Sequence, residues 1–143
     1  MLVQLKLAET RVLKLEAQPQ LLLPDQITFN QVQIPALDTA IACANQRMLE
    51  VIDSSQLDQS NWTISVRQAL PLTSETGKQL TDRLTFLDQG QTFTINSVDQ
   101  LIFKGSGSTK IDLAKHLKLM LHPSDETGKY QGTLVWNLAD APS

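Results

Sequence analysis

Residues 130–142 read Tyr-Gln-Gly-Thr-Leu-Val-Trp-Asn-Leu-Ala-Asp-Ala-Pro, and this stretch constrains the fold more than any other. Large apolar residues occupy every second position of its centre: Leu134, Trp136 and Leu138. Successive side chains of a β-strand point to opposite faces, so this alternation predicts a strand with one buried face. The other face would carry Thr133, Val135 and Asn137.

The same alternation recurs along the chain. It is found in residues 13–16, 62–67, 83–86, 92–95 and 117–122. Turn-forming residues separate these segments at 24–25, 88–90, 105–108 and 125–128. Many short alternating strands between polar turns are typical of an antiparallel β-sandwich. We therefore predict an all-β fold with Greek-key or immunoglobulin-like connections.

Three segments leave alternatives open at this stage. Residues 38–45 combine a possible Asp38 cap with helix-forming alanines, but would equally serve as a connection between sheets. Residues 112–115 fit one short helical turn. Residues 1–10 form either an N-terminal appendage or an extra strand, through the alternation of Val3, Leu5 and Leu7. We place the main domain at residues 11–143.

Residues 130–142 resemble the C-terminal signature of the WxL domain, a cell-surface module of Gram-positive bacteria. Five positions match that signature in register: Tyr130, Leu134, Trp136, Leu138 and Pro142. Val135 stands where the family usually has Thr. Residues 62–66, Trp-Thr-Ile-Ser-Val, resemble the first motif of the family, with Ile64 in place of Leu. The resemblance covers roughly residues 11–143.

The resemblance implies a secreted, non-catalytic protein that attaches non-covalently to the cell wall, through peptidoglycan or another wall polymer. It also implies that the protein works beside other surface proteins, including a membrane-anchored partner. The alternative is a protein–protein assembly module that docks a partner surface protein, for example through an exposed strand edge. The spacing of the His, Cys, Asp and Glu residues predicts no metal site, and we expect no cofactor.

The composition restricts the partners further. A formal net charge of −3 argues against nucleic acid, which requires a basic surface. No apolar run reaches the roughly 18 residues of a membrane span, and no signal peptide is visible. Either Met1 is a start residue added to a recombinant chain, or the chain is one domain of a longer secreted protein. We expect the single cysteine, Cys43, to be a small buried hydrophobe.

No catalytic pattern is found in the sequence. His116 and His122 would flank one strand, about 20 Å apart, so we expect solvated histidines rather than a shared metal site. Residues 105–110 lack the spacing of a phosphate-binding loop, and we expect a hairpin loop there. Asp53 follows Val51 in a segment that resembles one the family places before its first tryptophan. We expect Asp53 to form hydrogen bonds with the local backbone and so to shape the turn that leads to Trp62.

The motif residues have two interpretations. Trp62 and Trp136 are either a surface platform for sugar rings or core anchors, and their aliphatic neighbours favour the core. The motif residues considered for binding are Trp62, Ile64, Tyr130, Leu134, Trp136 and Leu138. If these residues are structural, the binding surface lies in loops or on the outward faces of strands. The candidate residues there are Arg67, Lys104, Lys110 and Asn137. We expect Tyr130 to pack at a sheet edge, with its hydroxyl satisfied locally, and Pro142 to end the last strand.

Overall fold

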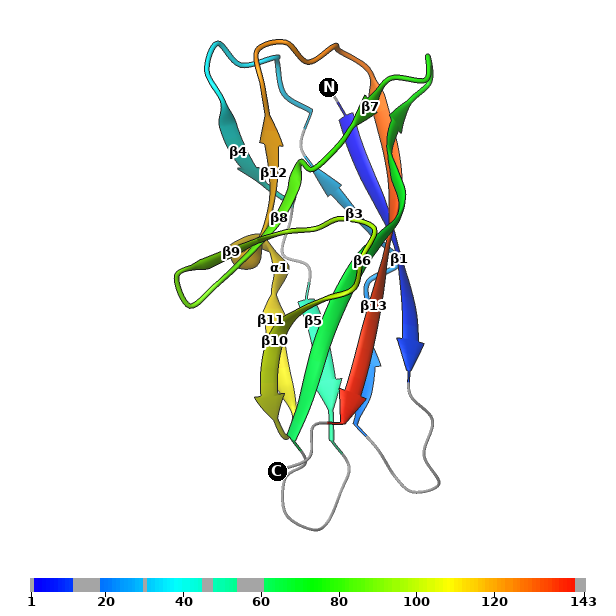
Figure 1. Ribbon diagram of the computed structural model, residues 1–143, viewed down its shortest axis with the longest axis vertical. Coiled ribbons are helices and arrows are strands. Elements are labelled where there is room, and N and C mark those ends of the chain that lie inside the picture. The colour runs from blue at the N-terminus through cyan, green and yellow to red at the C-terminus, as the bar shows by residue number, and fades with distance from the viewer. Residues whose placement is uncertain (1, 12–18, 30, 45–47, 54–60, 141–143) are drawn as a thin grey trace.

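The alternating segments fold into two packed layers of strands in the computed structural model, which describes residues 2–11, 19–29, 31–44, 48–53 and 61–140 (Figure 1). One layer, sheet A, has the strand order β10–β6–β13–β1–β3, with β7 paired to β6. Its strands are β1 (Leu2–Arg11), β3 (Gln26–Phe29), β6 (Asn61–Ser74), β7 (Gln79–Leu80), β10 (Gln100–Ser106) and β13 (Lys129–Asp140). The paired β6 and β13 run along the long axis of the molecule (Figure 1).

The second layer consists of two shorter sheets. Sheet B has the order β11–β5–β2, and sheet C has the order β4–β12–β8–β9. Their strands are β2 (Gln20–Leu22), β4 (Thr39–Ala42), β5 (Met48–Ile52), β8 (Leu84–Asp88), β9 (Gln91–Thr94), β11 (Thr109–Asp112) and β12 (Leu117–Leu121). The chain runs from β11 through the short helix α1 (Leu113–His116) into β12, so the two sheets follow one another along the long axis (Figure 1).

The inner faces of all three sheets share one hydrophobic core. Leu5 of sheet A, Val51 of sheet B and Phe86 of sheet C all belong to it and are fully buried. The alternation read from the sequence thus places one face of each strand in this core. The prediction of an all-β, sandwich-like fold built from antiparallel sheets is confirmed.

One strand pair departs from the antiparallel pattern. β1 pairs with β13 in parallel, with Leu2 opposite Lys129 and Arg11 opposite Leu138. The N-terminal segment is therefore a strand, the second of the two alternatives for residues 1–10, and it lies between β13 and β3. Because β13 has β6 on its other side, Tyr130 occupies an interior strand, and its predicted place at a sheet edge is wrong.

The other two segments with open alternatives, residues 38–45 and 112–115, contain a strand and a helical turn. Residues 38–45 contain strand β4, not a helix. Residues 112–115 do form a helical turn, because the Asp112 side chain accepts a hydrogen bond from the Ala114 N–H and caps α1. The turn at 88–90 joins β8 to β9, with positive φ at Gln89 (50°) and Gly90 (78°), as a two-residue type I′ hairpin requires.

The expected hairpin loop at residues 105–110 is wrong. β10 pairs with β6 in sheet A, whereas β11 pairs with β5 in sheet B. The turn between them carries the chain from one layer to the other, with Gly107 at φ 64°. The expected strand at 13–16 and the role of Pro142 lie outside the described residues.

Candidate functional site

Trp62 is fully buried where β6 begins, at the turn from β10 to β11. Its indole Nε1–H donates a 2.9 Å hydrogen bond to the carbonyl oxygen of Gly107. Its ring stacks on Phe103, with centroids 5.9 Å apart. A Cβ at Gly105 would lie 2.5 Å from the Trp62 ring, so this position requires glycine. Trp62 thereby fixes the turn that joins the two layers.

Trp136 is buried to the same degree on β13 but has different partners. Its ring meets Phe86 of sheet C edge-on, with centroids 6.3 Å apart. Its Nε1–H has no hydrogen-bond partner among the described residues. Trp136 therefore stabilises the contact between the two layers through packing alone.

Both tryptophans are core residues, so the core interpretation is confirmed and a surface platform for sugar rings is wrong. The remaining motif residues are buried as well: Ile64, Tyr130, Leu134 and Leu138. Their side chains lie in the core and not on the surface. The motif that gives the resemblance is therefore the framework of the sandwich.

The hydroxyl of Tyr130 is satisfied locally, as predicted, although the side chain is buried in the core and not at a sheet edge. The hydroxyl donates a 2.8 Å hydrogen bond to the carbonyl oxygen of Glu126. Burial raises the pKa of Tyr130, and the neighbouring carboxylates of Asp125 and Glu126 raise it further. The side chain therefore stays a neutral hydrogen-bond donor.

Asp125 forms an ion pair that the sequence did not indicate. Its carboxylate is only 2% exposed and receives two 2.7 Å hydrogen bonds from the guanidinium of Arg83. The backbone N–H of His122 donates a third. Burial favours the neutral acid, but these bonds outweigh burial and hold the pKa of Asp125 below its ordinary value. Arg83 thereby ties the start of β8 to the loop before β13.

The outer face of sheet A gathers three of the four surface candidates. Arg67 pairs in register with Val135, and Asn137 pairs with Ser65. On β10, Lys104 lies opposite Thr63. The fourth candidate, Lys110, lies on β11 in sheet B and belongs to the other layer. The Oδ1 atom of Asn137 is buried and has no partner among the described residues.

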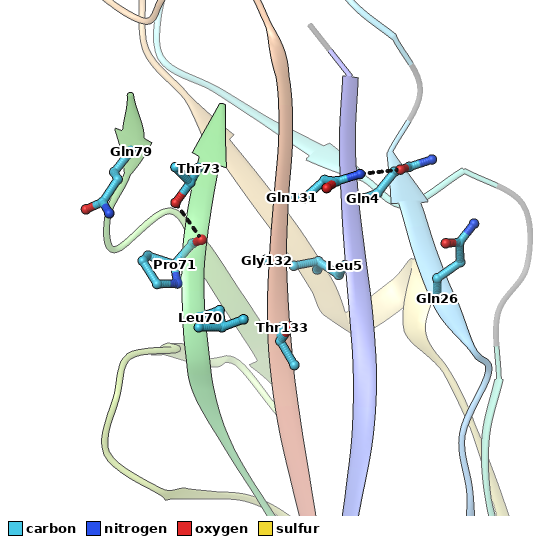
Figure 2. A pocket seen from close by; sticks show the side chains of 10 residues that line it. All are labelled: Gln4, Leu5, Gln26, Leu70, Pro71, Thr73, Gln79, Gln131, Gly132 and Thr133. Atoms are coloured by element: carbon cyan, nitrogen blue, oxygen red, sulfur yellow. Dashed lines mark hydrogen bonds between the residues drawn. The ribbon is translucent and has the colours of Figure 1, made fainter. Parts of the chain in front are cut away.

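A groove of about 660 Å³ lies on this outer face, further along the sheet. Its lining comes from β1, β3, β6, β7 and β13: Gln4, Leu5, Gln26, Leu70, Pro71, Thr73, Gln79, Gln131, Gly132 and Thr133. Figure 2 shows Gln4 and Gln131 pointing toward each other, with Leu70 and Pro71 on the β6 side. The predicted site residues do not include any of this lining.

The groove arises from a bulge in β6. The pairing of β6 with β13 shifts on both sides of Thr133, and Leu70 is turned outward and left 60% exposed. A Cβ at Gly132 would lie 2.9 Å from the carbonyl oxygen of Leu70, so only glycine allows this close approach. Pro71 and Gly132 are the signals in the sequence that mark this irregularity.

The histidines lie at opposite ends of β12. The two histidines therefore flank one strand, as predicted, but His116 ends α1 and its ring stacks on Phe86 with centroids 5.2 Å apart. His122 lies 2.8 Å from the Asp38 carboxylate. Within the described ranges, no three His, Cys, Asp or Glu residues are grouped to hold a metal ion.

At Asp53, the backbone N–H donates a hydrogen bond to the Ser108 hydroxyl. This bond ties the chain before Trp62 to the turn between β10 and β11.

No protein-family model matches the chain, and no curated protein matches it either.

Cys43 is buried, as expected. None of the helical segments that the structure describes is long and apolar enough to cross a membrane.

Proposed function

We propose that this chain is a secreted, non-catalytic binding module that attaches non-covalently to the Gram-positive cell wall, with peptidoglycan as its ligand. Two sequence motifs support the proposal through their resemblance to the WxL domain. Because those motif residues are buried, we propose that binding uses another surface. The supporting observation is the outer face of sheet A, where hydroxyl, amide and cationic side chains come from neighbouring strands.

This face suits a hydrated polymer. Arg67 is 41% exposed and its guanidinium lies 4.0 Å from the Asp99 carboxylate, a distance at which the pair is weak and leaves the cation available. Lys104 is exposed on the neighbouring strand β10. Peptidoglycan offers both carboxylates and sugar hydroxyls. The cationic side chains of the face can pair with the carboxylates, and its hydroxyl and amide side chains can form hydrogen bonds with the sugar hydroxyls.

Co-sedimentation with isolated Gram-positive cell walls tests the proposal. The chain should pellet with the walls, and an unrelated β-sandwich of similar charge should stay in solution. Equal pelleting of the two proteins would refute the proposal.

Matched charge variants locate the surface. The double change Arg67→Gln and Lys104→Gln removes two cations from the outer face of sheet A. Each exposed charge contact contributes about 0.5–1 kcal/mol, so the loss of two should lower wall affinity roughly 5- to 30-fold. Lys110→Gln removes the same charge from sheet B and should leave affinity unchanged. Equal effects from both changes would point to non-specific charge attraction.

A second candidate function is the docking of a partner surface protein. The observation that favours it is the outer strand β10, where Leu101 is 46% exposed beside the exposed Lys104. Such an edge can accept a strand from a partner. Binding of a partner ectodomain in the absence of cell walls, together with no pelleting with walls, would favour this candidate over the first.

A further inference from the structure

We infer that the groove on the outer face of sheet A binds an uncharged, N-acetylated saccharide, the chemistry of a peptidoglycan glycan strand. The inference rests on the proposed function for the source of the ligand. It goes further by separating the sugar-binding groove from the cationic part of the face. The groove residues are not among the positions that match either sequence motif.

The chemistry of the lining carries the inference. Four glutamine side chains, Gln4, Gln26, Gln79 and Gln131, surround the groove, with the hydroxyls of Thr73 and Thr133 between them. An amide group both donates and accepts hydrogen bonds, as do the hydroxyl and acetamido groups of a sugar. The described lining carries no charge, so it offers no partner for a carboxylate or phosphate.

The shape of the groove fits the same ligand. The nonpolar C–H surfaces of a sugar ring need an apolar contact, and the exposed Leu70 with Pro71 supplies one on the β6 side (Figure 2). Gln4 and Gln131 lie on the other side, and the Gln131 Nε2–H donates a 3.3 Å hydrogen bond to the Gln4 Oε1. The volume of about 660 Å³ lies within the range of roughly 300–1,000 Å³ that small-ligand sites occupy.

The backbone that forms the groove is rigidly placed. The groove lies over the pairing of β13 with both β6 and β1, in the middle of sheet A. Gly132 fixes the bulge by allowing close approach of the β6 backbone. Sites built on paired strands keep their geometry better than sites built on loops. On β1, Lys6 takes the register position opposite Thr133. A charged residue therefore lies next to the groove in the sheet, and the experiment must include a variant that removes this charge.

Titration with tri-N-acetylchitotriose, a neutral soluble oligosaccharide, followed by NMR, tests the inference. We expect saturable shifts of the backbone amides of Gln4, Gln131 and Thr133. The anionic trigalacturonate, a trisaccharide of similar size, should produce no such shifts. The double change Gln4→Ala and Gln131→Ala should weaken chitotriose binding roughly tenfold, because two amide partners are lost.

Three controls make the result specific. Gln20→Ala with Gln91→Ala removes two exposed amides from sheets B and C and should leave chitotriose binding unchanged. Lys6→Gln should also leave it unchanged, as should added salt, because the ligand is neutral. Thermal unfolding of each variant confirms that it is folded.

Several results would overturn the inference. These are no binding of chitotriose, equal binding by the Gln4/Gln131 variant, preference for trigalacturonate, or loss of binding on Lys6→Gln. The proposed function fails separately, if the unchanged chain does not pellet with cell walls. A chain that pellets with walls but ignores chitotriose would retain the proposed function and exclude the groove. The Arg67/Lys104 variant should lose wall affinity while still binding chitotriose.

Discussion

The two ends of the paired strands β6 and β13 are held by different chemistry. At one end, where Asp140 pairs with Trp62, an indole ring fills the space between Phe103 and the glycine turn. At the other end, where Tyr130 pairs with Ser74, the contacts are a buried ion pair and a tyrosine hydroxyl. We call these the Trp62 end and the Tyr130 end.

This difference shows that the two motifs, which begin at Trp62 and Tyr130, support the fold in different ways. The Trp62 end depends on apolar surface removed from water, which does not change with pH. The Tyr130 end depends on a carboxylate that must stay ionised inside the protein. Because both ends are structural, changes at either end should lower stability, and only changes on the outer face should act on binding directly.

Replacement of Trp62 by alanine should have the largest effect. It removes a fully buried indole and the hydrogen bond to Gly107, at a cost of about 3–5 kcal/mol in the free energy of unfolding. Urea unfolding followed by circular dichroism measures this. Trp136→Ala is the matched change, since its Nε1–H has no partner to lose among the described residues. A smaller loss for Trp62 than for Trp136 would contradict the clamping role of the Gly107 bond.

Replacement of Arg83 by methionine should have the next largest effect. It leaves the Asp125 carboxylate buried without its bidentate partner, at a cost of about 2–3 kcal/mol at neutral pH. Lys78→Met is the control, because Lys78 pairs with Glu126 where both side chains are more than half exposed, and it should cost under about 1 kcal/mol. Equal costs for the two variants would mean that the Arg83 pair does not stabilise the Tyr130 end.

The same ion pair predicts a pH dependence confined to one end. The pKa of Asp125 is lowered by folding, so its stabilisation is fully present above the ordinary carboxyl value of about 3.9 and is lost as pH falls through the folded value. Unfolding free energies measured from pH 7 downward should therefore fall more steeply in the unchanged protein than in Asp125→Asn. Parallel curves for the two proteins would contradict this assignment.

A methyl group at Gly105 tests the packing of the Trp62 end. The added Cβ would lie 2.5 Å from a rigid ring, so Gly105→Ala should cost about 1–3 kcal/mol. Gly128→Ala, at the Tyr130 end, meets its nearest atom at 3.5 Å and should change stability by less than about 0.5 kcal/mol. A tolerated alanine at Gly105 would mean that the ring can move aside.

Much of the framework could be predicted from the sequence because period-two alternation reports burial directly. Trp62, Leu134 and Trp136 were expected on inward faces, and each is fully buried. The parallel pairing of β1 with β13 could not be predicted, because alternation is the same for parallel and antiparallel neighbours. The turn after Gly105 was misassigned for the same reason: a pattern within one strand does not identify its partner.

The candidate site was harder to predict than the framework. Arg67, Lys104 and Asn137 share a face only because the register of three strands brings them together. The groove depends on a bulge that turns Leu70 outward against the alternation of its own strand. The buried state of Asp125 depends on Arg83, which lies 42 residues earlier in the chain. Each of these features is a long-range contact, which local patterns do not record.

The smallest predicted effect concerns the hydroxyl group at the Tyr130 end. Tyr130→Phe keeps the buried ring but removes the hydrogen bond to the Glu126 carbonyl, so the free energy of unfolding should fall by about 1 kcal/mol. Thr39→Val removes an exposed hydroxyl bonded to Leu37 and should change stability by less than about 0.5 kcal/mol. Chemical denaturation at pH 7 measures both variants. An unchanged free energy of unfolding in Tyr130→Phe would contradict the prediction. It would mean that the Arg83–Asp125 pair stabilises the Tyr130 end without a contribution from the tyrosine hydroxyl.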